Sequence, residues 1–247
     1  YYTLNMLSSG KVAIGSDLAT WYAPGTRLPS DLKWETTAQT NIGLDLGVYN
    51  NRYRLTLDYY IKNTRDLLNS VPLPTSLGYT NTVQNVGEIQ NKGFEIGLDA
   101  HVLTGDVNWN ITPHISFNKN KVKKLYGGND ILGNTYNTGV LTDYVNILRE
   151  GESLGIFYGY KETGYDENGL ITYLDVDEKG LIKSEDKMKI EAPNPTFTDG
   201  FTSNLAYKDF ECNFFLQGSY GNDIFNLYSI TTTQDMNYAH NRPRDMI

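Results

Sequence analysis

The sequence predicts an all-β fold of antiparallel strands, and three observations support that prediction. Apolar and polar residues alternate in several segments, which is the period-2 pattern of strands with one apolar and one polar face. Short turn sequences separate pairs of these segments, as they do in β-hairpins. The 247 residues also include 19 Tyr, 9 Phe and 23 Gly, a composition that favours sheet and turn over helix.

The first hairpin is predicted around Asn50-Asn51, two residues that tolerate the positive φ of a tight turn. In residues 42–48 the even-numbered positions are apolar, and in residues 53–61 the odd-numbered positions are apolar. Folding the chain at this turn places Leu44 opposite Leu57. A shift of one residue would bring apolar side chains opposite charged ones, so the pattern specifies the register.

The second hairpin is predicted around Thr104-Gly105, between segments 94–102 and 107–115. A two-residue turn there places Leu98 opposite Ile111, Ala100 opposite Trp109 and Phe94 opposite Ile115. His114 would then face Glu95. Pro113 cannot donate a ladder hydrogen bond, so it predicts a bulge or an interrupted pairing.

The third hairpin is predicted around Lys208-Asp209, with Leu205 opposite Cys212. The segments that link the hairpins are much longer than the turns, at about 63–89, 119–195 and 222 onward. Tight turns at one end and long loops at the other predict an up-and-down barrel with two unequal rims.

The alternation alone leaves two folds open. In a transmembrane barrel the apolar face meets lipid, whereas in a soluble β-sandwich it packs inward against a second sheet. The aromatic residues would suit the two girdles of a membrane barrel. Those beside the tight turns are Tyr53, Trp109, Tyr207 and Phe210, and those toward the long loops are Tyr59, Phe94, Phe117 and Phe201.

Charge and motifs exclude several functions. The 21 Lys and Arg against 29 Asp and Glu give a net charge of −8. The chain therefore lacks the excess of basic residues that nucleic-acid binding normally requires. Cys212 is the single cysteine, so no internal disulfide and no CxxC motif exists. No apolar stretch is long enough for a membrane-spanning helix. No GxSxG, HExxH, Walker-type or GxGxxG pattern occurs, and catalysis is not expected.

Several segments resemble one known family, the SusC/RagA-type TonB-dependent outer-membrane transporters. The match runs in order and spacing from about residue 30 onward, and its most specific segment is Asn85-Val-Gly-Glu-Ile-Gln-Asn-Lys-Gly-Phe-Glu-Ile-Gly-Leu98. The other matching segments are 32–47, 58–68, 155–160, 193–201 and 215–221. The resemblance favours the barrel over the sandwich.

The resemblance implies that residues 1–247 form part of the β-barrel domain of a transporter in the outer membrane of a Gram-negative bacterium. The barrel would be of the plugged, 22-stranded class, with the plug domain and the last strands outside this chain. Its short turns would be periplasmic, and residues 119–195 would form a long extracellular loop region. The family imports oligosaccharides or peptides. Its partners are a SusD-like surface lipoprotein, which covers the long loops, and TonB, which acts on the plug domain.

The expected loop region holds two candidate sites. Asp175, Asp177 and Asp186 have the spacing of a calcium loop, with oxygen ligands at alternate positions before Gly180. Position five is Lys179, whereas a calcium loop has Asp or Asn there. The family usually has an Asn-Gly-Asp-Gly-like stretch near this loop, and this sequence departs from it. We therefore expect an acidic turn without a metal or any other cofactor.

The second candidate is a group of aromatic residues that could stack on sugar rings or anchor a protein interface. The alternative for this group is packing inside the loop or against the barrel wall, and that alternative is preferred. Its members are Phe157, Tyr158, Tyr160 and Tyr165.

Two other functions stay open beside nutrient import. One is a soluble, secreted β-sandwich that binds carbohydrate. The other is an extracellular glycoside hydrolase, although no particular carboxylate pair stands out among the many Asp and Glu residues.

Overall fold

The computed structural model describes residues 7–24, 29, 31–77, 81–138 and 142–233. Most of them lie in antiparallel strands, and α1 (Leu227–Thr233) is the only α-helix among them. No helix of the described residues is long and apolar enough to cross a bilayer.

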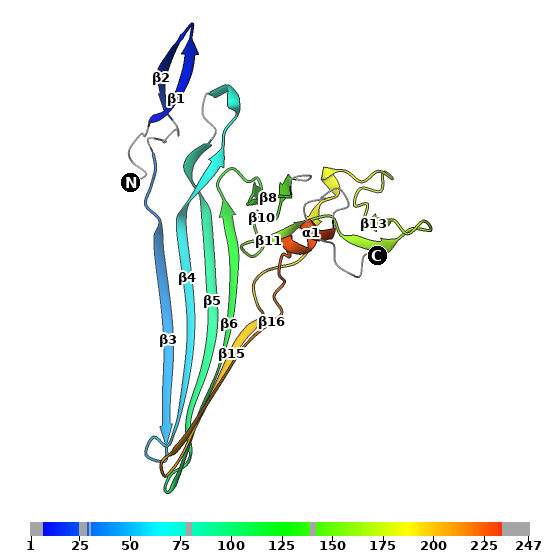
Figure 1. Ribbon diagram of the computed structural model, residues 1–247. Helices are drawn as coiled ribbons and strands as arrows, with labels where there is room; N and C mark the ends of the chain where they lie inside the picture. The colour runs from blue at the N-terminus through cyan, green and yellow to red at the C-terminus, as the bar shows by residue number, and fades with distance from the viewer. Residues whose placement is uncertain (1–6, 25–28, 30, 78–80, 139–141, 234–247) are drawn as a thin grey trace.

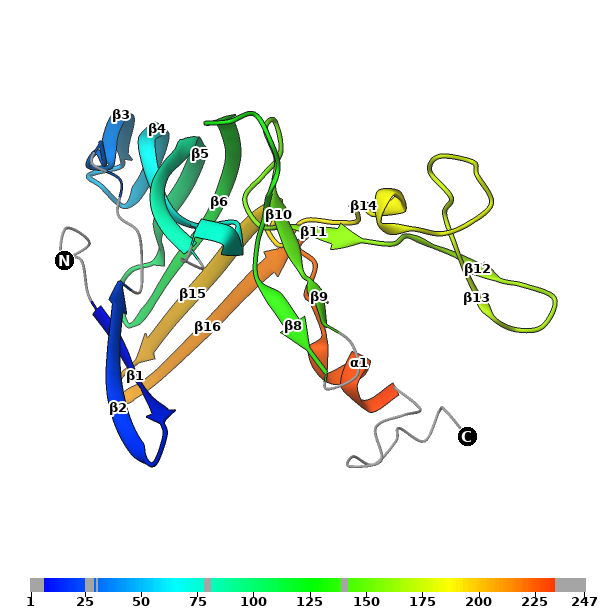
Figure 2. The same ribbon diagram turned by 90° about the horizontal axis from the view of Figure 1, so that it is seen from above.

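One six-stranded sheet, here called the wall, dominates the structure. Its spatial order is β16-β15-β6-β5-β4-β3, so each strand lies beside its neighbour in chain order. The strands are β3 (Thr36–Val48), β4 (Tyr53–Pro72), β5 (Asn81–Leu103), β6 (Val107–Leu125), β15 (Phe197–Tyr207) and β16 (Phe210–Tyr220). The three tight turns lie at one end of the wall (Figure 1), and from above the strands form an open curve (Figure 2). The wall is therefore an unclosed piece of a barrel.

Residues 126–196, here called the loop region, connect β6 to β15 at the opposite end from the tight turns (Figure 1). The strands there have two to four residues each. They are β7 (Ile131–Leu132), β8 (Thr135–Asn137), β9 (Thr142–Tyr144), β10 (Asn146–Leu148), β11 (Ile156–Gly159), β12 (Glu162–Tyr165), β13 (Ile171–Tyr173) and β14 (Met188–Lys189). A separate hairpin, β1 (Leu7–Ile14) with β2 (Asp17–Pro24), lies beyond the start of β3.

The predicted registers of the first and third hairpins are confirmed. Leu44 pairs with Leu57 in the first, and Leu205 pairs with Cys212 in the third. Asn50 and Asn51 have φ values of 56° and 62°, as a tight turn requires.

The predicted register of the second hairpin is wrong by two residues. Ala100 pairs with Ile111 rather than Trp109, and His114 pairs with Gly97 rather than Glu95. The loop contains three residues, Thr104 to Asp106, and a bulge lies between His101 and Leu103. A slip of two keeps every side chain on its own face, so the alternation could not detect it.

Pro113 interrupts the sheet as expected. The β5–β6 ladder has no pairs between Gly97–His114 and Ala100–Ile111, although Pro113 keeps its place opposite Phe201 of β15. The strands also extend further than predicted. β4 runs to Pro72, β5 begins at Asn81, and β6 continues to Leu125, so most of segment 63–89 and residues 119–125 lie in strands.

The wall has an apolar face without a covering layer. Leu44, Leu57, Leu98 and Ile111 share this face, and none of them is buried. On the edge strand β3 the apolar side chains are 47–66% exposed, from Leu46 to Ile42. A soluble sandwich would bury such residues under a second sheet, so the sandwich alternative is not supported.

The buried apolar side chains of the described residues lie mostly at the loop end. Ala100 is the exception, near the tight turns, where it pairs with Tyr53. The others are Val86, Val122, Leu125, Ile147 and Ile156. The core of the structure therefore sits where the wall meets the loop region.

Candidate functional site

The polar face of the wall, opposite its apolar face, carries side chains that bond across neighbouring strands. Arg54 Nη2 donates to Asp99 Oδ2 at 2.8 Å, and Thr56 Oγ1 donates to Asp45 Oδ1 at 3.0 Å. Tyr60 Oη donates to Asn118 Oδ1 at 3.1 Å, which links β4 to β6 across β5. These bonds hold a hydrophilic surface in fixed positions, as the lining of an aqueous bore requires.

Two carboxylates lie directly opposite each other on this polar face. Asp58 of β4 pairs in register with Glu95 of β5. Like charges in this arrangement destabilise a sheet, because their Cβ atoms are only about 5 Å apart. Ser116 Oγ, the next residue in the row, donates to Glu95 Oε1 at 3.5 Å. The pair makes this part of the polar face acidic.

Glycines on the polar face make room for large neighbours. A Cβ on Gly93 would lie 2.5 Å from the ring of Tyr60, and a Cβ on Gly200 would lie 2.1 Å from the ring of His114. Both rings can therefore lie flat along the wall rather than project into the bore.

Asn85, the first residue of the segment that most resembles the SusC/RagA family, forms hydrogen bonds to two other parts of the chain. Asn85 accepts a hydrogen bond from the Lys33 N–H at 2.8 Å and donates to the carbonyls of Lys33 and Asp66. Asp66 has φ +55° and lies in the bulge where the β4–β5 register shifts. Asn85 thus joins the segment before β3 to this bulge.

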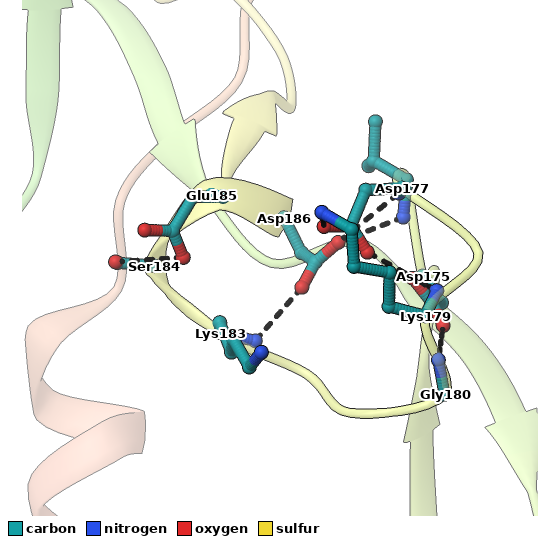
Figure 3. Close-up of polar contacts among 9 residues, drawn as sticks. Asp175, Asp177, Lys179, Gly180, Lys183, Ser184, Glu185 and Asp186 are labelled. Carbon is teal, nitrogen blue, oxygen red and sulfur yellow. Dashed lines mark hydrogen bonds and ion pairs between the residues drawn. The ribbon is translucent and has the colours of Figure 1, made fainter.

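The three aspartates of the calcium-like loop do come together. One oxygen of each of Asp175, Asp177 and Asp186 lies within 4.8 Å of the others (Figure 3). Asp186 is buried, with 1% of its surface exposed, although it lies nine residues or more along the chain from the other two.

Hydrogen bonds within the loop occupy every oxygen of this cluster. Asp175 accepts the N–H groups of Lys179 and Gly180, and Asp186 accepts those of Val176, Asp177 and Lys183. The Lys179 ammonium donates to Asp177 Oδ2 at 2.6 Å, and the Lys179 N–H donates to Asp177 Oδ1 (Figure 3). The lysine thus supplies a positive charge at the loop position where a calcium loop has a ligand.

The backbone hydrogen bonds of Asp186 also set its ionisation. The bond from the Lys183 N–H is the largest influence, and with those from Val176 and Asp177 it outweighs the opposing effect of burial. The pKa of Asp186 is therefore lowered from its usual value near 3.8. The carboxylate is ionised under all ordinary conditions.

The four predicted aromatic residues do not contact one another as one group. The Phe157 ring lies 6.2 Å from that of Phe225, and the Arg149 guanidinium lies 5.9 Å from the Tyr158 ring. Tyr160 packs near Tyr173 and beneath the Lys187 ammonium, with centroid distances of 5.8 and 5.3 Å. Tyr165, at the end of β12, is 68% exposed. Its hairpin with β13 extends away from the wall (Figure 2).

The sequence reasoning missed an ion pair that closes the loop region. Lys187 Nζ donates to both carboxylate oxygens of Asp143, 44 residues earlier in the chain. Burial lowers the pKa of Lys187, but the hydrogen bonds and charge of Asp143 outweigh it and raise the pKa. No short-range pattern marks this pair, so nothing in the sequence could have revealed it.

Comparison with known proteins identifies the family. The family model described as "TonB dependent receptor-like, beta-barrel" matches residues 6–220. The chain belongs to this family. Its members are outer-membrane proteins of Gram-negative bacteria, so the apolar face of the wall is the lipid-facing side of a TonB-dependent receptor barrel.

The named relatives include the SusC type that the sequence resembles. "TonB-dependent receptor P3" of Formosa agariphila is 35% identical over 243 residues, covering 92% of this chain and 24% of the relative. "TonB-dependent receptor SusC" of Bacteroides thetaiotaomicron is 34% identical over 205 residues, covering 79% and 20%. The chain thus spans about a quarter or less of the length of these relatives.

A solved structure of the RagAB peptide transporter shares the fold. Its TM-score with this chain is 0.71 at 23% identity, with 87% of this chain and 23% of that chain covered. The antiparallel barrel wall and its long loops are thereby confirmed, and the relative named SusC confirms the resemblance to the SusC/RagA type.

Proposed function

We propose that this chain is part of an outer-membrane importer that moves an oligosaccharide or a peptide. The two-faced wall carries the proposal, because it separates an uncovered apolar surface from a polar surface whose hydrogen bonds link β3, β4, β5 and β6. The relatives support it as well, since one is named SusC and the structural neighbour is titled a peptide transporter.

A growth and uptake experiment tests this function. The gene for the whole receptor is deleted and restored in its own bacterium, and uptake of fluorescent oligosaccharides and of fluorescent peptides is measured in each strain. We expect the deletion to abolish uptake of one of the two classes. Unchanged uptake and unchanged growth on both classes would contradict the proposal.

The proposed mechanism involves no catalysis by this chain. Energy would reach the barrel through TonB acting on a plug domain outside this sequence. The purified receptor should release no sugar from glycans and no fragment from peptides, and release that survives purification to homogeneity would favour the hydrolase alternative instead.

We also propose that a SusD-like lipoprotein contacts the loop region, with Tyr165 as a contact residue. Tyr165 is 68% exposed on the projecting β12–β13 hairpin, and exposed aromatic side chains are enriched at interfaces. Tyr49 is a matched control, because it is 80% exposed beside a tight turn at the opposite end of the wall.

Co-purification of the lipoprotein with tagged whole receptor measures this contact. Y165A should reduce the recovered lipoprotein, while Y49A should leave it unchanged. Equal recovery with both variants would remove Tyr165 from the interface without affecting the transport proposal.

A further inference from the structure

A row of aromatic rings crosses the apolar face of the wall near the loop end. Phe94 pairs in register with Phe117, whose ring centroid lies 6.0 Å from that of Phe197. Phe197 stacks on Tyr220 at 5.3 Å. Phe201, predicted for this girdle, lies four positions nearer the tight turn, and Phe197 takes its place. Such a row marks the level at which hydrocarbon gives way to lipid headgroups.

Lysines follow these rings on the same face. Lys92 and Lys119 are each two positions beyond a ring of the row, Phe94 and Phe117, and they lie directly opposite each other. Two positions along a strand place them roughly 7 Å further toward the loop region. Lys121 follows two positions later, so three ammonium groups occupy the apolar side of the wall at headgroup level.

These three lysines carry uncompensated charge. All three side chains are exposed, and among the described residues no carboxylate forms an ion pair with any of them. Like charges directly opposite each other, as Lys92 and Lys119 are, destabilise a sheet. The arrangement is notable in a chain whose net charge is −8, and an anionic ligand would relieve the repulsion.

The lysines line a hollow in the surface of about 510 Å³. Its wall side is formed by β5 and β6, and its other side by the loop segments 151–153 and 192–196. Lys189 lies at this hollow too, but its charge is already matched by Glu152 at 2.6 Å. The hollow is large enough for a phosphorylated headgroup and opens next to the aromatic row.

We propose that this lysine hollow binds the phosphate groups of an anionic lipid in the outer leaflet. The position of its lysines favours this class of ligand, because Lys92, Lys119 and Lys121 continue the apolar face directly beyond the girdle, where headgroup phosphates lie. Asn118 and Asn120, on the polar-face side of β6, complete the lining. The proposal needs only the placement of the apolar face in a membrane. It does not depend on transport or on the identity of the nutrient.

The test uses the whole receptor in lipid nanodiscs and counts bound lipid by native mass spectrometry. The lipids are a bisphosphorylated glycolipid and the same glycolipid after enzymatic removal of its phosphates. The variant K92Q/K119Q/K121Q removes the three charges. The control K62Q/K161Q/K208Q removes three charges from the polar face, the loop region and a tight turn.

We expect the wild type and the control to bind the phosphorylated lipid equally. The hollow variant should bind it roughly a hundredfold more weakly, because each lysine near an anionic headgroup contributes a factor of about five. K92R/K119R/K121R should retain binding, and all three triple variants should fold, as judged by heat-modifiable mobility on gels.

Three outcomes would overturn the proposal. The first is equal binding of the phosphorylated lipid by the hollow variant and the wild type. The second is binding of the dephosphorylated lipid by the wild type as strong as its binding of the phosphorylated lipid. The third is binding of free inorganic phosphate, or of an acidic protein partner, in place of the lipid.

Discussion

The wall and the loop region are stabilised in different ways. The wall has strands of 11–23 residues, and most of its exposed apolar side chains lie on one face, with Phe215 an exception on the other. The loop region has strands of two to four residues, yet it buries Ile147 and Ile156 almost completely. It also holds four of the six ion pairs found among the described residues.

The difference follows from what surrounds each region. Lipid solvates the apolar face of the wall, so the wall needs paired backbone groups and correct sidedness rather than a core. A region that is not solvated by lipid has only burial and internal polar contacts to offset the entropy of ordering the chain, and the loop region uses both. In the wall, the effect of a substitution on stability should therefore depend on which face it alters. In the loop region, it should depend on which local contacts are lost.

The largest effect is expected from reversing the sidedness of the wall. L57R places a charge on the lipid-facing side and should cost about 2–4 kcal/mol of folding free energy in a bilayer. The matched change T56R, one residue away on the polar face beside Asp45, should cost less than about 1 kcal/mol. Denaturant titrations of the whole receptor in lipid vesicles would measure both. Equal losses would show that the two faces are not distinct.

A smaller effect is expected from filling space on the polar face. G93A would bring a Cβ within 2.5 Å of the Tyr60 ring, and overpacking of this kind costs about 1–3 kcal/mol. G97A is the control, because its Cβ would meet only Thr56 Cβ at 3.9 Å. The same titrations should show a loss for G93A alone, and adding Y60S should restore stability. A loss with G97A as large as that with G93A would point to a general cost of replacing glycine in β5.

In the loop region, K179D should convert the acidic turn into a calcium site. The substitution removes the ammonium from Asp177 and adds an oxygen ligand at the fifth loop position. Calcium at ten times its dissociation constant should then stabilise the loop by about 1.4 kcal/mol. Calorimetry and protection of the loop from proteolysis would report binding, with wild type and K161D as controls that show none. Calcium binding by the wild type would refute the view that the Lys179 ammonium takes the place of the calcium ion.

The smallest effect concerns the charge of Asp186. Because its folded pKa is lowered, its stabilising contribution is present above about pH 3.8 and is lost as the pH falls through the folded value. Pepsin cleavage within residues 174–186 should therefore accelerate only below about pH 3.8. D186N should be cleaved quickly at every pH where pepsin is active. A cleavage rate for the wild type that does not change across this range would disprove the linkage.

The strands and faces of the wall could be predicted from the sequence, because alternation directly records which side meets lipid. The registers of the first and third hairpins followed from two-residue turns. The second could not, since the three-residue loop at Thr104–Asp106 and the bulge after His101 shift the register by an even number. Arg52 donates to the carbonyls of His101 and Val102 at this bulge, a contact between strands that no local pattern records.

Less of the candidate sites could be predicted. The convergence of Asp175, Asp177 and Asp186 followed from their spacing within one loop. The aromatic residues could not be placed, because their partners Phe225 and Tyr173 come from other segments. The lysines above the girdle were also missed, since only the pairing of β5 with β6 places Lys92 opposite Lys119.

The wall ends in two open margins, β3 on one side and β16 on the other. Along each margin, about half of the peptide groups point sideways without a ladder partner among the described strands, and hydrocarbon offers them none. These six strands could not persist in a bilayer as an isolated ribbon. Each margin must pair with further strands of the same barrel. When these six strands are produced alone, we expect the margins of neighbouring copies to pair with each other.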